Sequence, residues 1–229
     1  MDAARIAELL GPFLGDSPLN SSQLTAVSTY LDLLLRWNAK MNLTSLRDPA
    51  EIITRHFGES FFLAGQAVAA GREVTCVDVG SGAGFPGLPL KLYRPRVRLT
   101  LVEAQYRKAI FLREVIRALD LAGAEVFAGR AEEMAANPTP AADLVTMRAV
   151  ERFEEVLPVA ARLVRQDQNE VGRAGALALL IGAAGADRIA QLLPGFRWGE
   201  PMLVPQSSGR LLLLGWLETG KVKQPESSQ

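Results

Sequence analysis

Cysteine and histidine are almost absent from this chain. Its 229 residues include one cysteine, Cys76, and one histidine, His56. A single cysteine cannot build a disulfide framework, and one Cys with one His are too few ligands for a structural zinc site. The sequence therefore predicts no disulfide and no metal site, and its low cysteine content favours a reducing, cytoplasmic compartment.

Long apolar runs are absent as well. The longest, residues 175–186, has 12 residues, whereas a helix needs about 20 to span a bilayer. The N-terminus carries Asp2, Arg5 and Glu8 where an export signal would have a basic tip and an apolar stretch. We therefore expect a cytoplasmic protein with no membrane partner.

Neither sign of charge is in excess over the whole chain, which has 25 basic and 25 acidic side chains. Residues 71–120 depart from this balance, with 9 basic and 5 acidic side chains. Most of the surplus comes from Lys91, Arg94, Arg96, Arg98, Arg107, Lys108, Arg113 and Arg117. This segment is either the solvated face of a helix and its loop or a binding surface for a polyanion such as RNA.

Hydrophobic residues make up 48% of the chain, which excludes disorder as its main state. The first 70 residues have the pattern of helices. Asn20 followed by Gln23 is a helix N-cap signature, with apolar residues at helical spacing up to Lys40. Asp48 and Pro49 predict a second helix start, and this helix is expected to reach Phe62.

From residue 73 onward, strands and helices alternate. Strands are predicted at 74–79, 99–102, 125–127, 143–146 and 176–181, with helices at 106–119 and 153–164 and a polar loop at 166–175. Apolar runs at 202–204 and 211–214, separated by a Ser-Ser-Gly turn, predict a hairpin. The pattern predicts an α/β fold with a mostly parallel sheet, helices on both faces and a final antiparallel pair.

The first of these strands runs into a glycine-rich loop within residues 77–87. Gly82, Gly84 and Gly87 satisfy the G-x-G-x-x-G spacing, and Glu103 follows Gly82 by 21 residues at the end of the next strand. This pattern is typical of a dinucleotide site in which a carboxylate holds the ribose hydroxyls. S-adenosylmethionine needs the same contact, and glycines that merely shape a turn are the third interpretation.

Acidic and basic residues at the ends of the strands refine this choice. Asp78 would repel a pyrophosphate but suits the cationic methionine end of S-adenosylmethionine, or else it caps the loop. Ala131 and Glu132 follow the third strand and either border the adenine or open a helix. Arg148 ends the fourth strand, where it either pairs with a loop carboxylate, such as that of Asp78 or Glu103, or orients a phosphate or carbonyl of the substrate.

Three segments together resemble one family. They are W-N-A-K-M-N-L-T at 37–44, R-H at 55–56 and D-V-G-S-G-A-G-F-P-G at 78–87, and the similarity extends over residues 30–165. These segments resemble the bacterial RsmG (GidB) family of S-adenosylmethionine-dependent methyltransferases, which modify N7 of a guanine in 16S ribosomal RNA. The chain departs from the family at Ile181-Gly182, where Lys-Gly is usual, and at Glu59, where an aspartate is usual.

The resemblance implies a class I methyltransferase (Rossmann-like) with a mostly parallel seven-stranded sheet. It divides the chain into an N-terminal helical extension, 1–68, and a methyltransferase domain, 69–229. The cofactor is then S-adenosyl-L-methionine, and the partner is 16S ribosomal RNA or the assembling small ribosomal subunit, bound by a monomer. The cofactor-binding residues expected from the resemblance and the glycine loop are Asp78, Gly80, Gly82, Gly84, Phe85, Glu103, Ala131, Glu132 and Arg148.

Guanine N7 carries a lone pair and no proton, so its methylation needs alignment rather than a general base. Alignment of reactants can contribute about 7–11 kcal/mol. We therefore expect no catalytic residue that transfers a proton, and we expect Arg148 and His56 to position the substrate, although His56 could instead be a packed interface residue. Cys76 lies inside a strand and is expected in the core, which argues against pyrimidine-C5 methylation. Residues 137–140 lack the aromatic expected for exocyclic adenine methylation.

Three other functions remain open from the sequence. They are a small-molecule S-adenosylmethionine-dependent methyltransferase, an NAD-binding oxidoreductase, and a non-catalytic RNA-binding protein on a methyltransferase scaffold.

Overall fold

A computed structural model describes residues 1–136, 142–150, 152–166 and 175–218 of the chain. Most of the loop predicted at 166–175 and the whole 137–140 segment lie outside the described residues. Within the described ranges, no helix is both long and apolar enough to cross a membrane.

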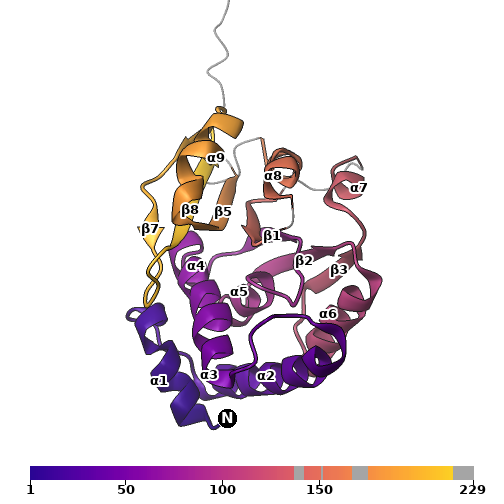
Figure 1. The fold of residues 1–229 in the computed structure, drawn as a ribbon, viewed down its shortest axis with the longest axis vertical. Helices are drawn as coiled ribbons and strands as arrows, with labels where there is room; N and C mark the ends of the chain where they lie inside the picture. The colour runs from indigo at the N-terminus through magenta and orange to yellow at the C-terminus, as the bar shows by residue number, and fades with distance from the viewer. Residues whose placement is uncertain (137–141, 151, 167–174, 219–229) are drawn as a thin grey trace, which may run out of the picture.

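Five parallel strands form the centre of the molecule (Figure 1). They are β1 (Val74–Val79), β2 (Val97–Glu103), β3 (Ala124–Ala128), β4 (Leu144–Arg148) and β5 (Ala176–Gly182). Their order across the sheet is β3-β2-β1-β4-β5. All five strands expected in this region are confirmed, to within a few residues at their ends.

Antiparallel strands complete the sheet beyond β5. Strand β8 (Arg210–Leu217) pairs with β5, with β6 (Phe196–Trp198) and with β7 (Met202–Leu203). The pair β7–β8 is the expected terminal hairpin. Seven strands lie on one continuous path, as expected, and the two-residue β7 pairs with β8 off that path, so the sheet has eight strands.

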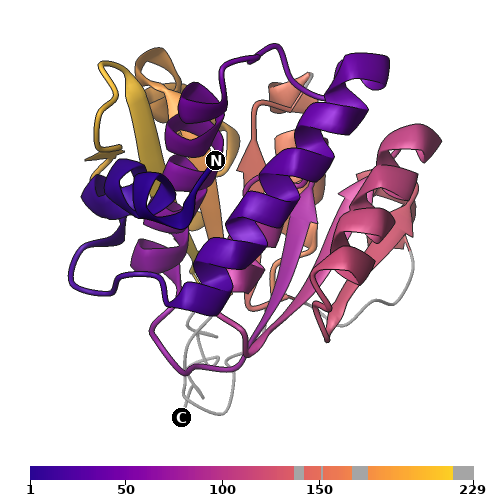
Figure 2. The same cartoon turned by 90° about the horizontal axis from the view of Figure 1, so that it is seen from below.

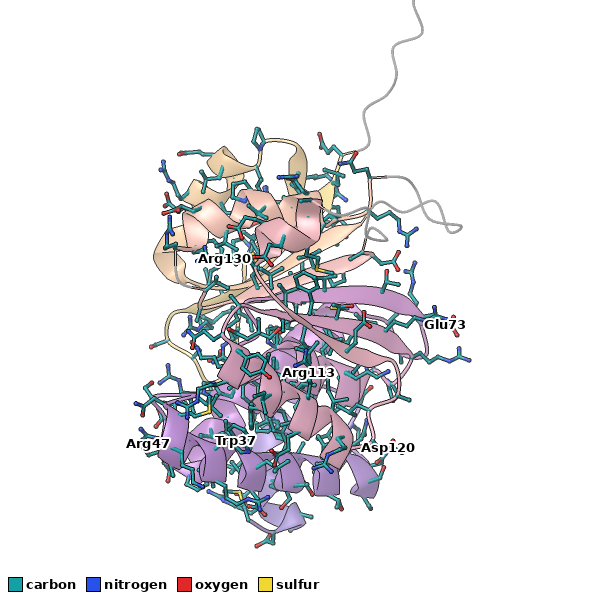
Figure 3. The ribbon with its side chains drawn as sticks, turned by 90° about the vertical axis from the view of Figure 1, so that its right-hand side faces the viewer. Trp37, Arg47, Glu73, Arg113, Asp120 and Arg130 are labelled. Carbon is teal, nitrogen blue, oxygen red and sulfur yellow. The ribbon has the colours of Figure 1, made fainter. Side chains whose placement is uncertain are left out.

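Helices cover both faces of the sheet, as Figures 1 and 3 show. The first face is covered by α1 (Ala3–Leu14), α2 (Ser21–Met41), α4 (Glu59–Ala67), α5 (Gly87–Tyr93) and α6 (Tyr106–Ala118). The second is covered by α7 (Ala131–Ala136), α8 (Phe153–Arg162) and, after the short turn η2 (Ala183–Gly185), α9 (Ala186–Leu192). Neighbouring strand residues alternate between the two cores, so Cys76 packs in the first and Val77 in the second.

The long helix α2 lies beside α6 across the first face (Figure 2). It begins as expected, because the Asn20 side chain accepts from the backbone N–H of Gln23, and Gln23 accepts from that of Asn20. It ends at Asn42, whose left-handed backbone (φ 48°) turns the chain toward residues 43–46.

The helix predicted to start at Asp48 also forms and continues beyond Phe62. Asp48 caps it by accepting from Glu51 N at 2.8 Å. Its first part, α3 (Pro49–Ile52), leads through a π-helical segment, η1 (Ile53–Gly58), directly into α4. Such wider turns are often found at functional sites, and this one carries His56.

The glycine loop after β1 needs glycine at Gly84 for two reasons. Its φ is 92°, a conformation that L side chains rarely adopt. A Cβ there would also collide with the Tyr30 hydroxyl and lie 2.5 Å from Leu88 Cδ1.

We predict that Gly84→Ala lowers the free energy of unfolding by about 3 kcal/mol, because backbone strain adds to the collision. Gly65→Ala, inside α4, is the matched control. A Cβ at Gly65 meets Tyr93 only at 3.9 Å, so this change should be neutral or stabilising by up to about 1 kcal/mol. Urea denaturation of both variants checks the prediction, and equal effects would contradict it.

Candidate functional site

A cavity of about 360 Å³ opens at the carboxyl ends of β1, β2 and β4. In a parallel sheet this edge is where ligands bind, at the point where the chain reverses its direction across the strand order. Here that point lies between β1 and β4. The lining residues are Leu43, Thr44, His56, Gly80–Ala83, Phe85, Glu103–Gln105, Lys108 and Arg148–Val150.

The glycine loop forms one wall of this cavity. The N–H groups of Gly80 and Ser81 both donate to Val102 O, at 3.0 and 3.1 Å, and so fasten the loop to β2. Gly80 and Gly82 have positive φ angles, and a Cβ on Gly80 would lie 2.9 Å from Val150 Cγ2. At these two positions the backbone carries no side chain, as the close approach of a ligand requires.

Glu103 is buried beside this loop. Its Oε2 accepts from Gly82 N at 2.8 Å and its Oε1 from Gln105 N at 2.7 Å. A carboxylate oxygen can accept more than one hydrogen bond, so each oxygen keeps acceptor capacity. Glu103 is thus fixed in place and still able to accept from two hydroxyl groups, which fits the ribose of a nucleoside cofactor.

Asp78 lies beneath the loop and does not line the cavity. It is fully buried, accepting from Thr146 Oγ1 at 2.7 Å and from Gly87 N at 3.3 Å. Burial raises the pKa of Asp78 to about 6, although these hydrogen bonds act in the opposite direction. The geometry corresponds to the loop-capping alternative for this residue.

Three other expected cofactor residues also lie outside the cavity lining. Gly84 packs under Tyr30, Ala131 is buried in the second core, and Glu132 is exposed on α7. The structure does bring together the remaining six expected residues, which are His56, Gly80, Gly82, Phe85, Glu103 and Arg148.

Phe85 connects the loop to the helical layer through a stack of rings. Its ring lies 5.3 Å from Tyr30, nearly parallel, and 4.8 Å from His56, while Phe57 meets it edge-on. The Tyr30 hydroxyl donates to Ala83 O in the loop. The imidazole of His56 is therefore held in a fixed plane at the cavity wall.

His56 bonds through both ring nitrogens. Arg148 Nη2 lies 2.8 Å from Nδ1, and Thr44 Oγ1 lies 2.7 Å from Nε2. Burial lowers the pKa of His56 to about 3, with further lowering by Arg148 and Arg55. The ring is therefore neutral at pH 7, and because a guanidinium can only donate, Nδ1 is the acceptor and Nε2 carries the hydrogen.

The carboxylate partner of Arg148 is Glu59, rather than Asp78 or Glu103. Arg148 Nη2 lies 3.4 Å from Glu59 Oε2, and both side chains are at most 8% exposed. Arg210 lies 3.7 Å from the same oxygen. Burial lowers the pKa of Arg148 to about 10, against an opposing effect of Glu59, so Arg148 remains a cation at neutral pH.

Sequence reasoning did not include Thr44, Gln105 or Lys108 among the site residues. Thr44 belongs to the W-N-x-x-x-N-L-T segment, and Lys108 belongs to the basic stretch 71–120, so both carried a signal in the sequence. For Gln105, which follows Glu103 closely, the sequence offered none.

The W-N-x-x-x-N-L-T segment has a structural role at this wall. Trp37, labelled on α2 in Figure 3, donates to Glu114 Oε2 of α6 at 3.1 Å. Asn38 is buried, and its side chain bonds Thr44 N at 2.9 Å and Leu46 O at 3.3 Å. The segment thus fixes the turn that presents Thr44 to the cavity. Trp37 and Asn38 thus have packing and hydrogen-bonding roles and are not among the residues that line the cavity.

Cys76 is buried, as expected of a core residue. Burial is the main cause that raises the pKa of its thiol well above the usual range. A thiol in this environment does not ionise near neutral pH and is not an available nucleophile.

Comparison with known proteins finds relatives that carry one family name. The sequence model of the GidB family, described as rRNA small subunit methyltransferase G, matches residues 23–173. A ribosomal RNA small subunit methyltransferase G from Xanthomonas campestris pv. campestris (strain 8004) is 38% identical over 182 residues, covering 79% of this chain and 80% of that protein. The protein of the same name from Stenotrophomonas maltophilia (strain K279a) is 35% identical over 208 residues, covering 90% and 92%.

The fold has solved counterparts. A SAM-dependent methyltransferase from Aquifex aeolicus superimposes with a TM-score of 0.55 at 18% identity, covering 77% of this chain and 97% of that one. The expected class I methyltransferase fold is confirmed by this similarity and by the strand order.

The single histidine allows a direct test of the site. In protein with labelled imidazole nitrogens, we expect one set of ring signals, a neutral ring with hydrogen on Nε2, and no titration between about pH 5 and 8. The unfolded chain binds this proton near pH 6.5 and the folded chain only near 3. His56 therefore lowers the free energy of unfolding as the pH falls through that window. A folded-state pKa near 6.5 or an Nδ1–H tautomer would contradict the assignment.

Proposed function

This chain belongs to the ribosomal RNA small subunit methyltransferase G family, and we propose that it transfers a methyl group from S-adenosylmethionine to N7 of a guanine in 16S ribosomal RNA. One structural observation supports the proposal independently of the family. A single cavity at the carboxyl edge of the sheet is lined by Glu103, by the loop at Gly80 and Gly82, and by the hydrogen-bonded pair His56 and Arg148.

S-adenosylmethionine, when bound, supplies a methyl group on an electrophilic sulfonium. In our proposal the Glu103 carboxylate accepts from the ribose hydroxyls, and the backbone of Gly80 and Gly82 allows the ligand to approach closely. Phe85 and Arg148 complete the lining. Because the fixed Glu103 oxygens keep free acceptor capacity, the residues present fit such a nucleoside.

The expected residues outside the cavity lining have different places in the proposal. Asp78 and Gly84 shape the loop from beneath. Ala131 and Glu132 follow a segment that starts beside the site, because Gly129 N donates to Glu103 O at 3.1 Å. We propose that this segment borders the adenine side.

The residues around the substrate position it and do not move a proton. Guanine N7 has no proton to remove, and neutral His56 is fully engaged by Arg148 and Thr44. Methylation leaves a positive charge on the purine. The Glu59 carboxylate beside Arg148 lowers the net positive charge that this purine would meet. Placing the base in line with the methyl group is then the main contribution, on the order of several kcal/mol.

Ribosomal RNA of the small subunit is the substrate class named for the family. We propose further that the chain acts as a cytoplasmic monomer on free 16S RNA or on the assembling small subunit. In this arrangement residues 1–68 form a helical extension and residues 69–229 the methyltransferase domain. The extension supplies Thr44 and His56 to the cavity, so the division does not separate two independent sites.

The direct test is methylation of unmodified 16S RNA with methyl-labelled cofactor, followed by digestion and nucleoside analysis. We expect label only in 7-methylguanosine. Label in a base methylated at an exocyclic amine, or no label with either naked RNA or small subunits as substrate, would overturn the proposal.

A second test concerns the cofactor site. Glu103→Gln should weaken S-adenosylhomocysteine binding about tenfold or more, since the amide has one acceptor oxygen in place of two and its NH₂ would face a backbone N–H. Glu125→Gln on neighbouring β3, where the carboxylate accepts from Thr100 on the exposed surface, is the control. Calorimetric titration measures both, and unchanged affinity in Glu103→Gln would exclude Glu103 from the ribose contact.

A further inference from the structure

Thr44 has a hydroxyl whose acceptor positions are both occupied. Its Oγ1 lies 2.7 Å from His56 Nε2 and accepts from Leu46 N at 3.2 Å. With Nε2 carrying the hydrogen, both lone pairs of Oγ1 are used. No acceptor for the hydroxyl proton lies among the residues that the structure describes, and Thr44 lines the cavity.

Groups of the protein itself fix the hydrogen-bonding role of this hydroxyl. The imidazole cannot turn over, because its ring stacks on Phe85 and its Nδ1 must accept from the buried Arg148 cation. Backbone N–H of Leu46 holds Oγ1 from the other side. The Thr44 hydroxyl can therefore act only as a donor toward a further partner, and Thr44 is one of the residues that line the cavity.

We propose, on the basis of the proposed function, that the Thr44 hydroxyl donates to O6 of the target guanine and so selects guanine over adenine. The edge of guanine that carries N7 presents two adjacent acceptors, N7 and O6. Adenine presents N7 beside an NH₂ donor, which would face the Thr44 donor with no acceptor between them. A single locked donor next to the reacting nitrogen therefore distinguishes the two purines without contacting N7 itself.

The test compares RNA substrates that differ in the target base, in addition to enzyme variants. Short RNAs containing the methylated site carry guanine, 2-aminopurine, which keeps N7 but lacks O6, or hypoxanthine, which keeps both. Single-turnover rates are measured with the wild-type chain, Thr44→Val, Thr44→Ser and the control Thr25→Val on the exposed face of α2. The ratio of the guanine rate to the 2-aminopurine rate cancels differences in overall activity between variants.

We expect the wild-type chain to methylate guanine and hypoxanthine at similar rates and 2-aminopurine at least about tenfold more slowly. Thr44→Val should reduce the guanine to 2-aminopurine ratio by about tenfold, while Thr44→Ser and Thr25→Val should keep it. An unchanged ratio in Thr44→Val would overturn the inference.

The outcome does not depend on whether Thr44→Val folds. If that variant is inactive on every RNA, the wild-type comparison decides, because equal rates on guanine and 2-aminopurine would mean that O6 is not read. Failure of the proposed function is a separate result, in which the wild-type chain forms no 7-methylguanosine on the guanine RNA. Formation of that product at a rate that does not depend on O6 would exclude only the proposed role of Thr44.

Discussion

The hydrogen bond between Arg148 and His56, 2.8 Å long, joins the two halves of the site. Arg148 comes from the end of β4, and His56 comes from a π-helical turn of the first helical layer. Glu59 is the buried carboxylate beside this guanidinium. Burial is the main cause that keeps the imidazole of His56 neutral, and the charge of Arg148 adds to it. Because Arg148 can only donate, the contact also fixes the tautomer of His56. Without this pair the cavity would have a sheet wall and a helical wall with no fixed relation between their polar groups.

Local signals in the sequence predicted much of the fold. The Asn20 cap, the β-branched strand β1 and the turn between β7 and β8 each depend on neighbouring residues, and all three form. Glu103 was placed correctly because parallel strands end at one sheet edge. Helix α1 lies in the region predicted to be helical, but its bounds were not given, and it contains Pro12. Strand β6 was not predicted, since its three residues depend on pairing with β8.

The rest of the site depends on contacts that no local pattern records. Arg148 pairs with Glu59 across 89 positions of sequence, and the sequence offered Asp78 and Glu103 as equally reasonable partners. Asp78 was expected near the cofactor, yet its hydrogen bonds to Thr146 and Gly87 place it below the loop. Tertiary packing decides which carboxylate lines the cavity and which supports the loop from beneath, because both lie near the carboxyl ends of neighbouring parallel strands.

In our proposal one cavity holds the cofactor and the target base together. A crystal structure of the chain with S-adenosylhomocysteine is the decisive measurement. We expect the ribose hydroxyls on the Glu103 carboxylate and the sulfur facing the side of the cavity that Thr44 and His56 line. A nucleoside bound elsewhere, or bound here with its ribose away from Glu103, would contradict it.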